Sequence, residues 1–186
     1  MSGFEYQDDA RRFLDELGEW LAKFGLELHP DKTRLIECGR RATIDRRRRG
    51  LGKPQTFDFL GFPQICARMP AGRCWVRRIT IKKRMRGELA EVKDQLRCRR
   101  HEPILVHRRW LAHVLRGHMA YYCVPGNSDA VSAFRYQVTL LWHRSLRRRS
   151  QRGRVNWDRM DRYATRWLPK VRTRHPYPDA RRAART

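Results

Sequence analysis

The sequence lacks the features of secreted and membrane-spanning proteins. It contains no run of about 18 apolar residues, and its first residues show no basic segment followed by an apolar one. Its five cysteines are odd in number, lie far apart and form no Cys-x-x-Cys pair, which excludes the common zinc and redox motifs. We therefore predict a cytoplasmic protein with reduced thiols that does not span a membrane.

Acidic residues are also scarce over most of the chain. Residues 1–62 carry 12 Lys and Arg against 11 Asp and Glu, whereas residues 63–186 carry 31 against 8, a net charge of +23. A surface this basic attracts polyanions such as RNA, DNA or an anionic membrane, because neutralised phosphates release counterions. The basic segments alternate with Trp and Tyr instead of forming one amphipathic helix, so we favour nucleic acid over a membrane surface.

The chain has enough apolar material to fold, since 40% of its residues are hydrophobic. Apolar spacing predicts a helix over residues 9–24, with Asp8 or Asp9 able to cap its start and Gly25 placed to end it. Short strands are predicted at residues 26–28 and 34–38 on either side of a turn, followed by a flexible basic loop over residues 39–56.

Beyond this loop the pattern changes from strands to helices. Residues 57–62 predict a strand that closes in a turn at Pro63, and residues 73–81 predict another β-prone stretch. Helices are expected over residues 85–96, over 110–122, from Asn127 or Ser128 onward, and over 157–167. The expected fold class is α+β, with a mainly helical body.

Several residues invite a functional interpretation. The adjacent pair Asp8 and Asp9 could hold metal, but helix capping explains it better. Lys32, in a tight turn, could meet a phosphate, but ordinary solvated turn chemistry explains it better. One of the adjacent Tyr121 and Tyr122 is expected to pack in the core and the other to make contacts. For the dense basic clusters the functional interpretation leads, because like charges repel unless a polyanion is present.

Several segments, in this order and spacing, resemble bacterial group II intron reverse transcriptase/maturases. They are residues 25–35 (GLELHPDKTRL), 57–62 (FDFLGF), 116–127 (RGHMAYYCVPGN) and 141–151 (LWHRSLRRRSQ), with Trp167-Leu168-Pro169 and His175-Pro176 near the end. The resemblance covers essentially the whole chain. It implies a truncated palm remnant in residues 1–63, a β-prone connection in 64–81, a thumb or maturase-specific X domain in 82–175 and a basic tail in 176–186.

The resemblance also implies roles for single residues. Lys32 corresponds to the lysine of the palm's late turn, and Phe59, Leu60 and Gly61 correspond to the primer grip. The sequence starts after the position of the family's metal-binding carboxylates, so no cofactor is expected in this chain, although the full-length enzyme uses Mg²⁺. The residues predicted to bind RNA are Lys82, Lys83, Arg84, Arg86, Arg116, Tyr121, Tyr122, Arg135, Arg144, Arg147, Arg148, Arg149, Arg152 and Arg154.

The leading functional hypothesis is an RNA-binding maturase fragment that supports binding and splicing of a group II intron RNA and cannot polymerise by itself. One alternative is a split RNA-directed DNA polymerase that acts only in trans with a fingers/palm piece. Another is a truncated product without function. A DNA target is a further candidate partner.

Overall fold

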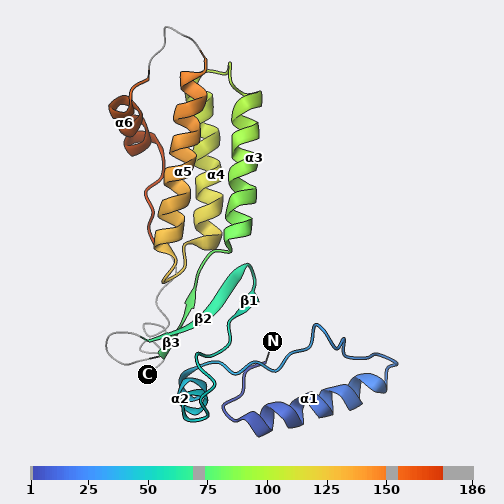
Figure 1. Ribbon diagram of the computed structural model, residues 1–186. Helices are drawn as coiled ribbons and strands as arrows, with labels where there is room; N and C mark the ends of the chain where they lie inside the picture. Colours follow the sequence, from blue (N-terminus) through green and yellow to red (C-terminus); the bar gives the residue numbers. More distant parts are fainter. Residues whose placement is uncertain (1, 69–73, 150–154, 174–186) are drawn as a thin grey trace, which may run out of the picture. The chain divides into compact units, whose positions relative to one another are not determined.

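The computed structural model describes residues 2–68, 74–149 and 155–173. The chain divides into two compact units, Met1–Gln55 and Thr56–Thr186. The described residues form six helices and a three-stranded antiparallel sheet (Figure 1), so the predicted α+β class is confirmed. Because the division follows Gln55, the whole FDFLGF segment belongs to the second unit. The palm and thumb assignments stay predictions.

The first unit begins with helix α1, Gln7–Ala22, which confirms the helix expected there. The helix starts earlier than predicted: Tyr6 is its N-cap, and Asp8 and Asp9 lie in its first turn without capping it. Carboxylates in that turn are still favoured by the positive end of the helix dipole. Gly25, at φ +68°, follows the end of the helix, as expected for a residue that must adopt the left-handed conformation.

Two predicted strands of the first unit are wrong. Residues 26–28 and 34–38 are described and neither forms a strand, although the turn between them is present, with the backbone N–H groups of Lys32 and Thr33 donating to the carbonyl of His29. A strand requires a paired neighbour, and β-propensity in a run of three to five residues cannot replace one.

The predicted flexible loop over residues 39–56 is also wrong in part, because helix α2, Arg40–Arg48, forms within it. Arginine is a good helix former, so a run of arginines is compatible with a helix. Glu37 accepts hydrogen bonds from Arg49 at 2.9 Å and Arg46 at 3.4 Å, and these guanidinium groups lower the pKa of its carboxyl. Arg46 also donates to the carbonyls of Leu51 and Lys53, which folds the following segment back onto the helix.

The second unit starts with the sheet, in strand order β1-β2-β3: Phe57–Phe59, Phe62–Arg68 and Cys74–Arg78. Leu60 and Gly61 form a two-residue turn, both with positive φ (48° and 80°), as in the type I′ turns that suit the twist of a hairpin. The turn predicted at Pro63 is therefore wrong. Pro63 lies inside β2, opposite Asp58.

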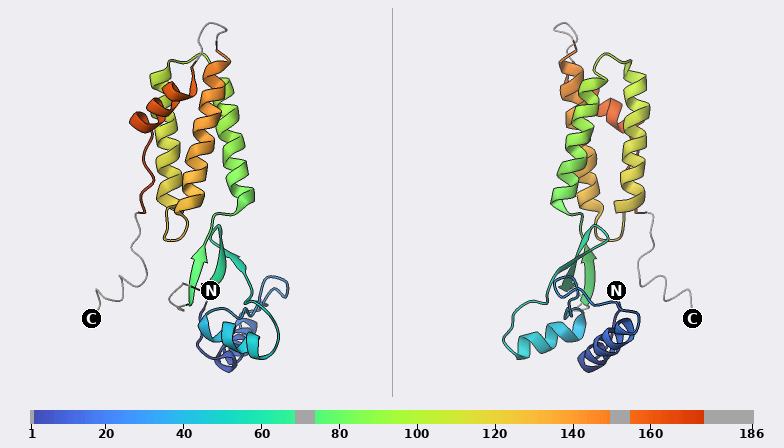
Figure 2. Two further views of the ribbon diagram at one scale, coloured as in Figure 1. Left: turned by 60° about the vertical axis from the view of Figure 1, so that its left-hand side comes forward. Right: turned by 90° about the vertical axis from the view of Figure 1, so that its right-hand side faces the viewer.

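Four helices follow, as predicted, and carry the core of the second unit. They are α3 (Lys82–Cys98), α4 (Ile104–Tyr122), α5 (Ser128–Arg147) and α6 (Trp157–Trp167). Figures 1 and 2 show α3, α4 and α5 running alongside one another, and α6 packs on α5. The core side chains include Leu96, Leu111, Leu115, Phe134, Val138, Trp142 and Met160, each no more than 2% exposed.

One buried polar residue joins the sheet to the helices. Asn127, which is 1% exposed, accepts a hydrogen bond from the backbone N–H of Thr80 at 2.9 Å. Its amide nitrogen donates to the Thr80 hydroxyl at 2.7 Å and to the carbonyl of Tyr122 at 2.8 Å. Asn127 therefore fixes the segment that leads into α3 against the connection between α4 and α5.

Candidate nucleic-acid interface

The turn of the β1–β2 hairpin contacts two helices of the second unit. The hydroxyl of Tyr121, at the end of α4, donates a hydrogen bond to the carbonyl of Leu60 at 2.7 Å, across 61 positions of sequence. A Cβ atom on Gly61 would lie 2.7 Å from Nη1 of Arg84, so the Arg84 guanidinium lies beside the turn. Two residues of the predicted primer grip and two residues predicted to bind RNA thus form one surface, which we call the hairpin joint.

Aromatic side chains pack against one another next to the hairpin joint. The ring of Phe62 stacks on Tyr121 with centroids 5.8 Å apart and meets the edge of Tyr122 at 5.5 Å. Tyr122 is 5% exposed, and burial raises the pKa of its hydroxyl, whereas Tyr121 is 49% exposed. One tyrosine of the pair is therefore a core residue, as predicted, and the other reaches the surface. Phe59 is 39% exposed.

Basic side chains surround the start of α3. Lys82, Lys83, Arg84 and Arg86 are all exposed, and the first turn of this helix contains no acidic residue. The N-cap residue, Ile81, offers no side-chain hydrogen bond, so the positive end of the helix dipole adds to these cations. This arrangement attracts phosphate groups.

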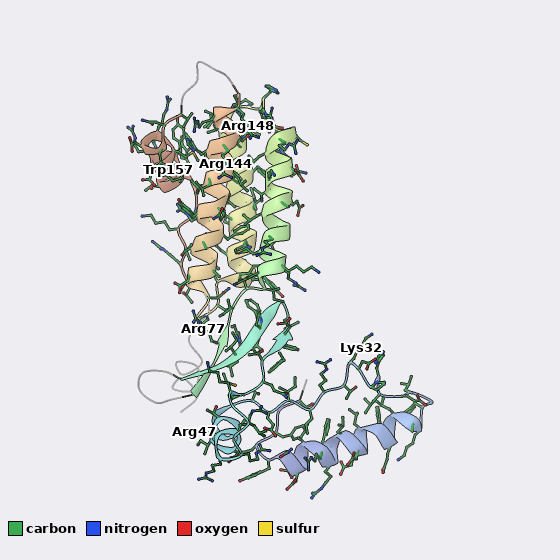
Figure 3. The ribbon with its side chains drawn as sticks, in the orientation of Figure 1. Lys32, Arg47, Arg77, Arg144, Arg148 and Trp157 are labelled. Atoms are coloured by element: carbon green, nitrogen blue, oxygen red, sulfur yellow. The ribbon has the colours of Figure 1, made fainter. Side chains whose placement is uncertain are left out.

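A second exposed basic cluster lies at the other end of the helices. Arg144, Arg147 and Arg148 are exposed at the C-terminal end of α5, and Figure 3 shows Arg144, Arg148 and Trp157 at this same end. Within the part of the chain that the structure describes, no acidic side chain pairs with these three guanidinium groups. We call these three arginines the α5 basic cluster.

Sequence reasoning missed an aromatic surface near the α5 basic cluster. Tyr136 on α5 is 53% exposed and Trp157 on α6 is 39% exposed, with ring centroids 6.2 Å apart. His143 also meets the Trp157 ring, at 5.3 Å. Exposed rings beside arginines provide stacking platforms for bases. The signal in the sequence that could have indicated this surface is Trp157 itself. It directly follows the capping residue Asn156, at a position where the core does not require a tryptophan.

Two arginines predicted to bind RNA are engaged inside the protein. Arg135 donates to the carbonyls of Ala164 and Pro169, both at 2.9 Å, and so holds the end of α6. Arg149 donates to the carbonyl of Glu102, and it lies 2.9 Å from Nε2 of His107. These contacts give both arginines a structural role.

Of the remaining predicted site residues, two are exposed and two lie outside the described residues. Arg116 is exposed on α4, and Lys32 is exposed in the turn of the first unit. Arg152 and Arg154 lie outside the described residues, as do His175-Pro176 and the basic tail.

The described residues offer charge and stacking surfaces rather than a metal centre. Across residues 2–68, 74–149 and 155–173, no group of three or more His, Cys, Asp or Glu side chains is arranged to hold a metal ion. None of the described helices is both long and apolar enough to cross a membrane. Comparisons of the chain with protein-family models, with curated proteins and with solved structures found no match.

Proposed function

We propose that this chain is an RNA-binding maturase of the group II intron reverse transcriptase type, and that the helices of its second unit bind the intron RNA. The observation that carries the proposal is the α5 basic cluster, three exposed arginines for which the described part of the chain offers no acidic partner, at the end of a helix whose opposite face is buried. The motif resemblance supplies the identity of the RNA. The hairpin joint supports it further, because it brings residues of two separate motifs, 57–62 and 116–127, beside the basic residue Arg84.

The physical basis of binding is electrostatic. The second unit contains 31 Lys and Arg and nine Asp and Glu, and such a surface gains affinity by releasing counterions from phosphates. RNA helices are bound largely through their backbone and shape, which requires basic side chains on a rigid scaffold. The exposed rings of Tyr136 and Trp157 add a stacking surface for unpaired bases.

The test measures binding of a fluorescently labelled intron RNA by anisotropy across a salt series. With about six phosphates contacted, the slope of log K against log salt concentration should be about −5. The triple variant Arg144→Ala, Arg147→Ala, Arg148→Ala should flatten this slope by about 2 to 3, since each lost phosphate contact removes about 0.9. A slope unchanged by this variant would contradict a role for the cluster.

A matched control separates a local interface from net charge. Lys93, Arg97 and Arg109 are exposed on α3 and α4 and belong to none of the predicted binding residues. Their replacement by alanine removes the same total charge, so it should flatten the slope much less. If both triple variants lose affinity equally, attraction is diffuse. Equal affinity for RNA and heparin at physiological salt would refute specific RNA recognition.

The surface of the first unit favours a second candidate function, a split polymerase completed by another polypeptide. Its described residues bury one hydrophobic side chain, Ala10, and leave nine large ones exposed, namely Phe4, Tyr6, Phe13, Trp20, Phe24, Leu26, Leu35, Ile44 and Leu51. Among them, Phe4 contacts Phe13 and Trp20 contacts Phe24, and exposed apolar side chains that gather in this way are typical of interaction sites. Primer extension by this chain mixed with a fingers/palm fragment should then exceed extension by either piece alone, and no excess would exclude this function.

A further inference from the structure

A pocket of about 660 Å³ lies between α3 and α4, and its floor is Phe134 of α5. We call it the α3–α4 pocket. One face of each helix lines it, from Arg84 to Gln95 on α3 and from Trp110 to Tyr122 on α4. Its volume lies in the range of about 300–1,000 Å³ that is typical of ligand sites.

The pocket is lined by two acidic side chains, whereas the second unit as a whole is strongly basic. Two of the unit's nine acidic residues, Glu88 and Glu91, line the pocket, one and nearly two helical turns beyond Arg84. Carboxylates beside a phosphate would oppose binding, but they accept hydrogen bonds from the N–H groups of a base. The pocket therefore suits the base of a nucleotide better than its phosphate.

The inner wall of the pocket is aromatic and holds an unused polar atom. The ring of His118 stacks on Phe134 with centroids 3.7 Å apart, and its Nδ1 donates to Glu88 at 2.6 Å. Burial lowers the pKa of His118, against the opposing effect of the Glu88 carboxylate. Its Nε2 is buried and has no hydrogen-bond partner among the described residues. Trp110 and the exposed Tyr121 complete the aromatic lining.

A glycine in the wall has no explanation within the protein. Gly117 lies inside α4, where glycine costs about 1 kcal/mol relative to alanine. A Cβ atom at Gly117 would meet nothing within 4 Å, so the packing of the chain does not require a glycine there. Glycine in such a position allows a ligand to approach the backbone closely.

We propose that the α3–α4 pocket binds an unpaired guanine base of the RNA. The carboxylates accept hydrogen bonds from the Watson–Crick edge of guanine, Arg84 donates to its O6 and N7 acceptors, and the aromatic side chains stack on the ring. This inference rests on the proposed function, because the base is presented by the bound RNA.

The test compares three RNA hairpins that differ at one position: a guanosine bulge, an adenosine bulge and no bulge. The full chain should bind the guanosine hairpin about 10-fold more tightly than the hairpin without a bulge, since stacking and base hydrogen bonds contribute on this scale. Gly117→Leu places a bulky side chain on the pocket wall where the base would approach the backbone, and should abolish this preference. It should leave the affinity for the bulge-free hairpin unchanged.

Gly87→Leu is the matched control. Gly87 is an exposed glycine inside α3 that does not line the pocket, and a Cβ there also meets nothing within 4 Å. This variant should keep the guanosine preference. Both variants should fold, because leucine is the better helix former, and circular dichroism checks this.

Glu91→Gln provides a second test. A carboxylate that reads guanine predicts a loss of discrimination between guanosine and adenosine bulges, whereas a purely electrostatic role raises both affinities equally. Absence of a guanosine preference in the native chain, or its survival in Gly117→Leu, overturns the pocket assignment. Weak, salt-insensitive binding of the bulge-free hairpin instead overturns the proposed RNA-binding function.

Discussion

Replacing Asn127 should reveal how strongly the sheet of the second unit is tied to its helices. The Asn127→Ala change removes three hydrogen bonds at once, one accepted from the Thr80 N–H and two donated to Thr80 and Tyr122. All of them are buried, since Asn127 is 1%, Thr80 5% and Tyr122 5% exposed. Water cannot replace the lost partner without entering the core.

The magnitude follows from the groups left behind. A hydrogen bond contributes about 1 kcal/mol net, and a buried group left unpaired costs about 1–3 kcal/mol. The Thr80 hydroxyl can rotate, and the carbonyl of Tyr122 still accepts from the N–H of Val124, so the N–H of Thr80 is the group left unpaired and the other two losses are those of single hydrogen bonds. We expect the free energy of unfolding to fall by about 3 kcal/mol and the melting temperature by about 10 °C.

Urea unfolding followed by far-ultraviolet circular dichroism measures this loss. Thr80→Val removes only the hydroxyl acceptor and should cost about 1 kcal/mol. In the double variant the two losses should fall short of additive, because both residues share one hydrogen bond. A loss below about 0.5 kcal/mol for Asn127→Ala, within the range of ordinary surface substitutions, would refute the structural role of this residue.

Three further predictions concern the hairpin joint and a buried histidine. Tyr121→Phe removes the hydrogen bond to Leu60 and should cost about 1 kcal/mol, with faster amide exchange in the β1–β2 hairpin. Gly61→Ala should cost about 1–2 kcal/mol in urea unfolding, because φ is +80° at this position; the Arg84 guanidinium, 2.7 Å from the new Cβ, can move aside, and an unchanged stability would contradict the positive φ. Burial lowers the pKa of His107, so the unfolded state binds the proton more readily and stability should fall as the pH drops below about 6.5. His107→Gln should weaken this pH dependence, and an unaltered profile would show that other groups cause it.

Helical periodicity proved the most reliable signal in the sequence. Apolar spacing predicted α3 to α6, because a helix that packs on a core must repeat its apolar residues every three to four positions. Strands β1 and β3 lie within stretches that were predicted, but the central strand β2, Phe62–Arg68, was missed where a turn was expected. Leucine is unusual at positive φ, so Leu60 does not indicate a turn, whereas Pro63, a common turn residue, lies inside a strand.

The local sequence pattern gave wrong predictions where the structure depends on contacts with other segments. Residues 26–28 and 34–38 have strand-like composition, yet a strand exists only when another pairs with it. The basic run over residues 40–48 forms a helix, and Glu37, outside the helix, pairs with Arg46 and Arg49 at its C-terminal end. Such contacts cannot be read from the composition of the run itself.

By itself, the sequence determined the charge of this protein and the apolar faces of its helices, since both are sums over residue types and their spacing. The tertiary structure alone decided which basic residues are exposed and can bind a polyanion. Arg135 and Arg149 are engaged with backbone carbonyls, whereas Arg144 and Arg148 are exposed. It also assembled the residues of the hairpin joint and those of the α3–α4 pocket. Contacts between distant segments depend on how the helices pack rather than on any local pattern.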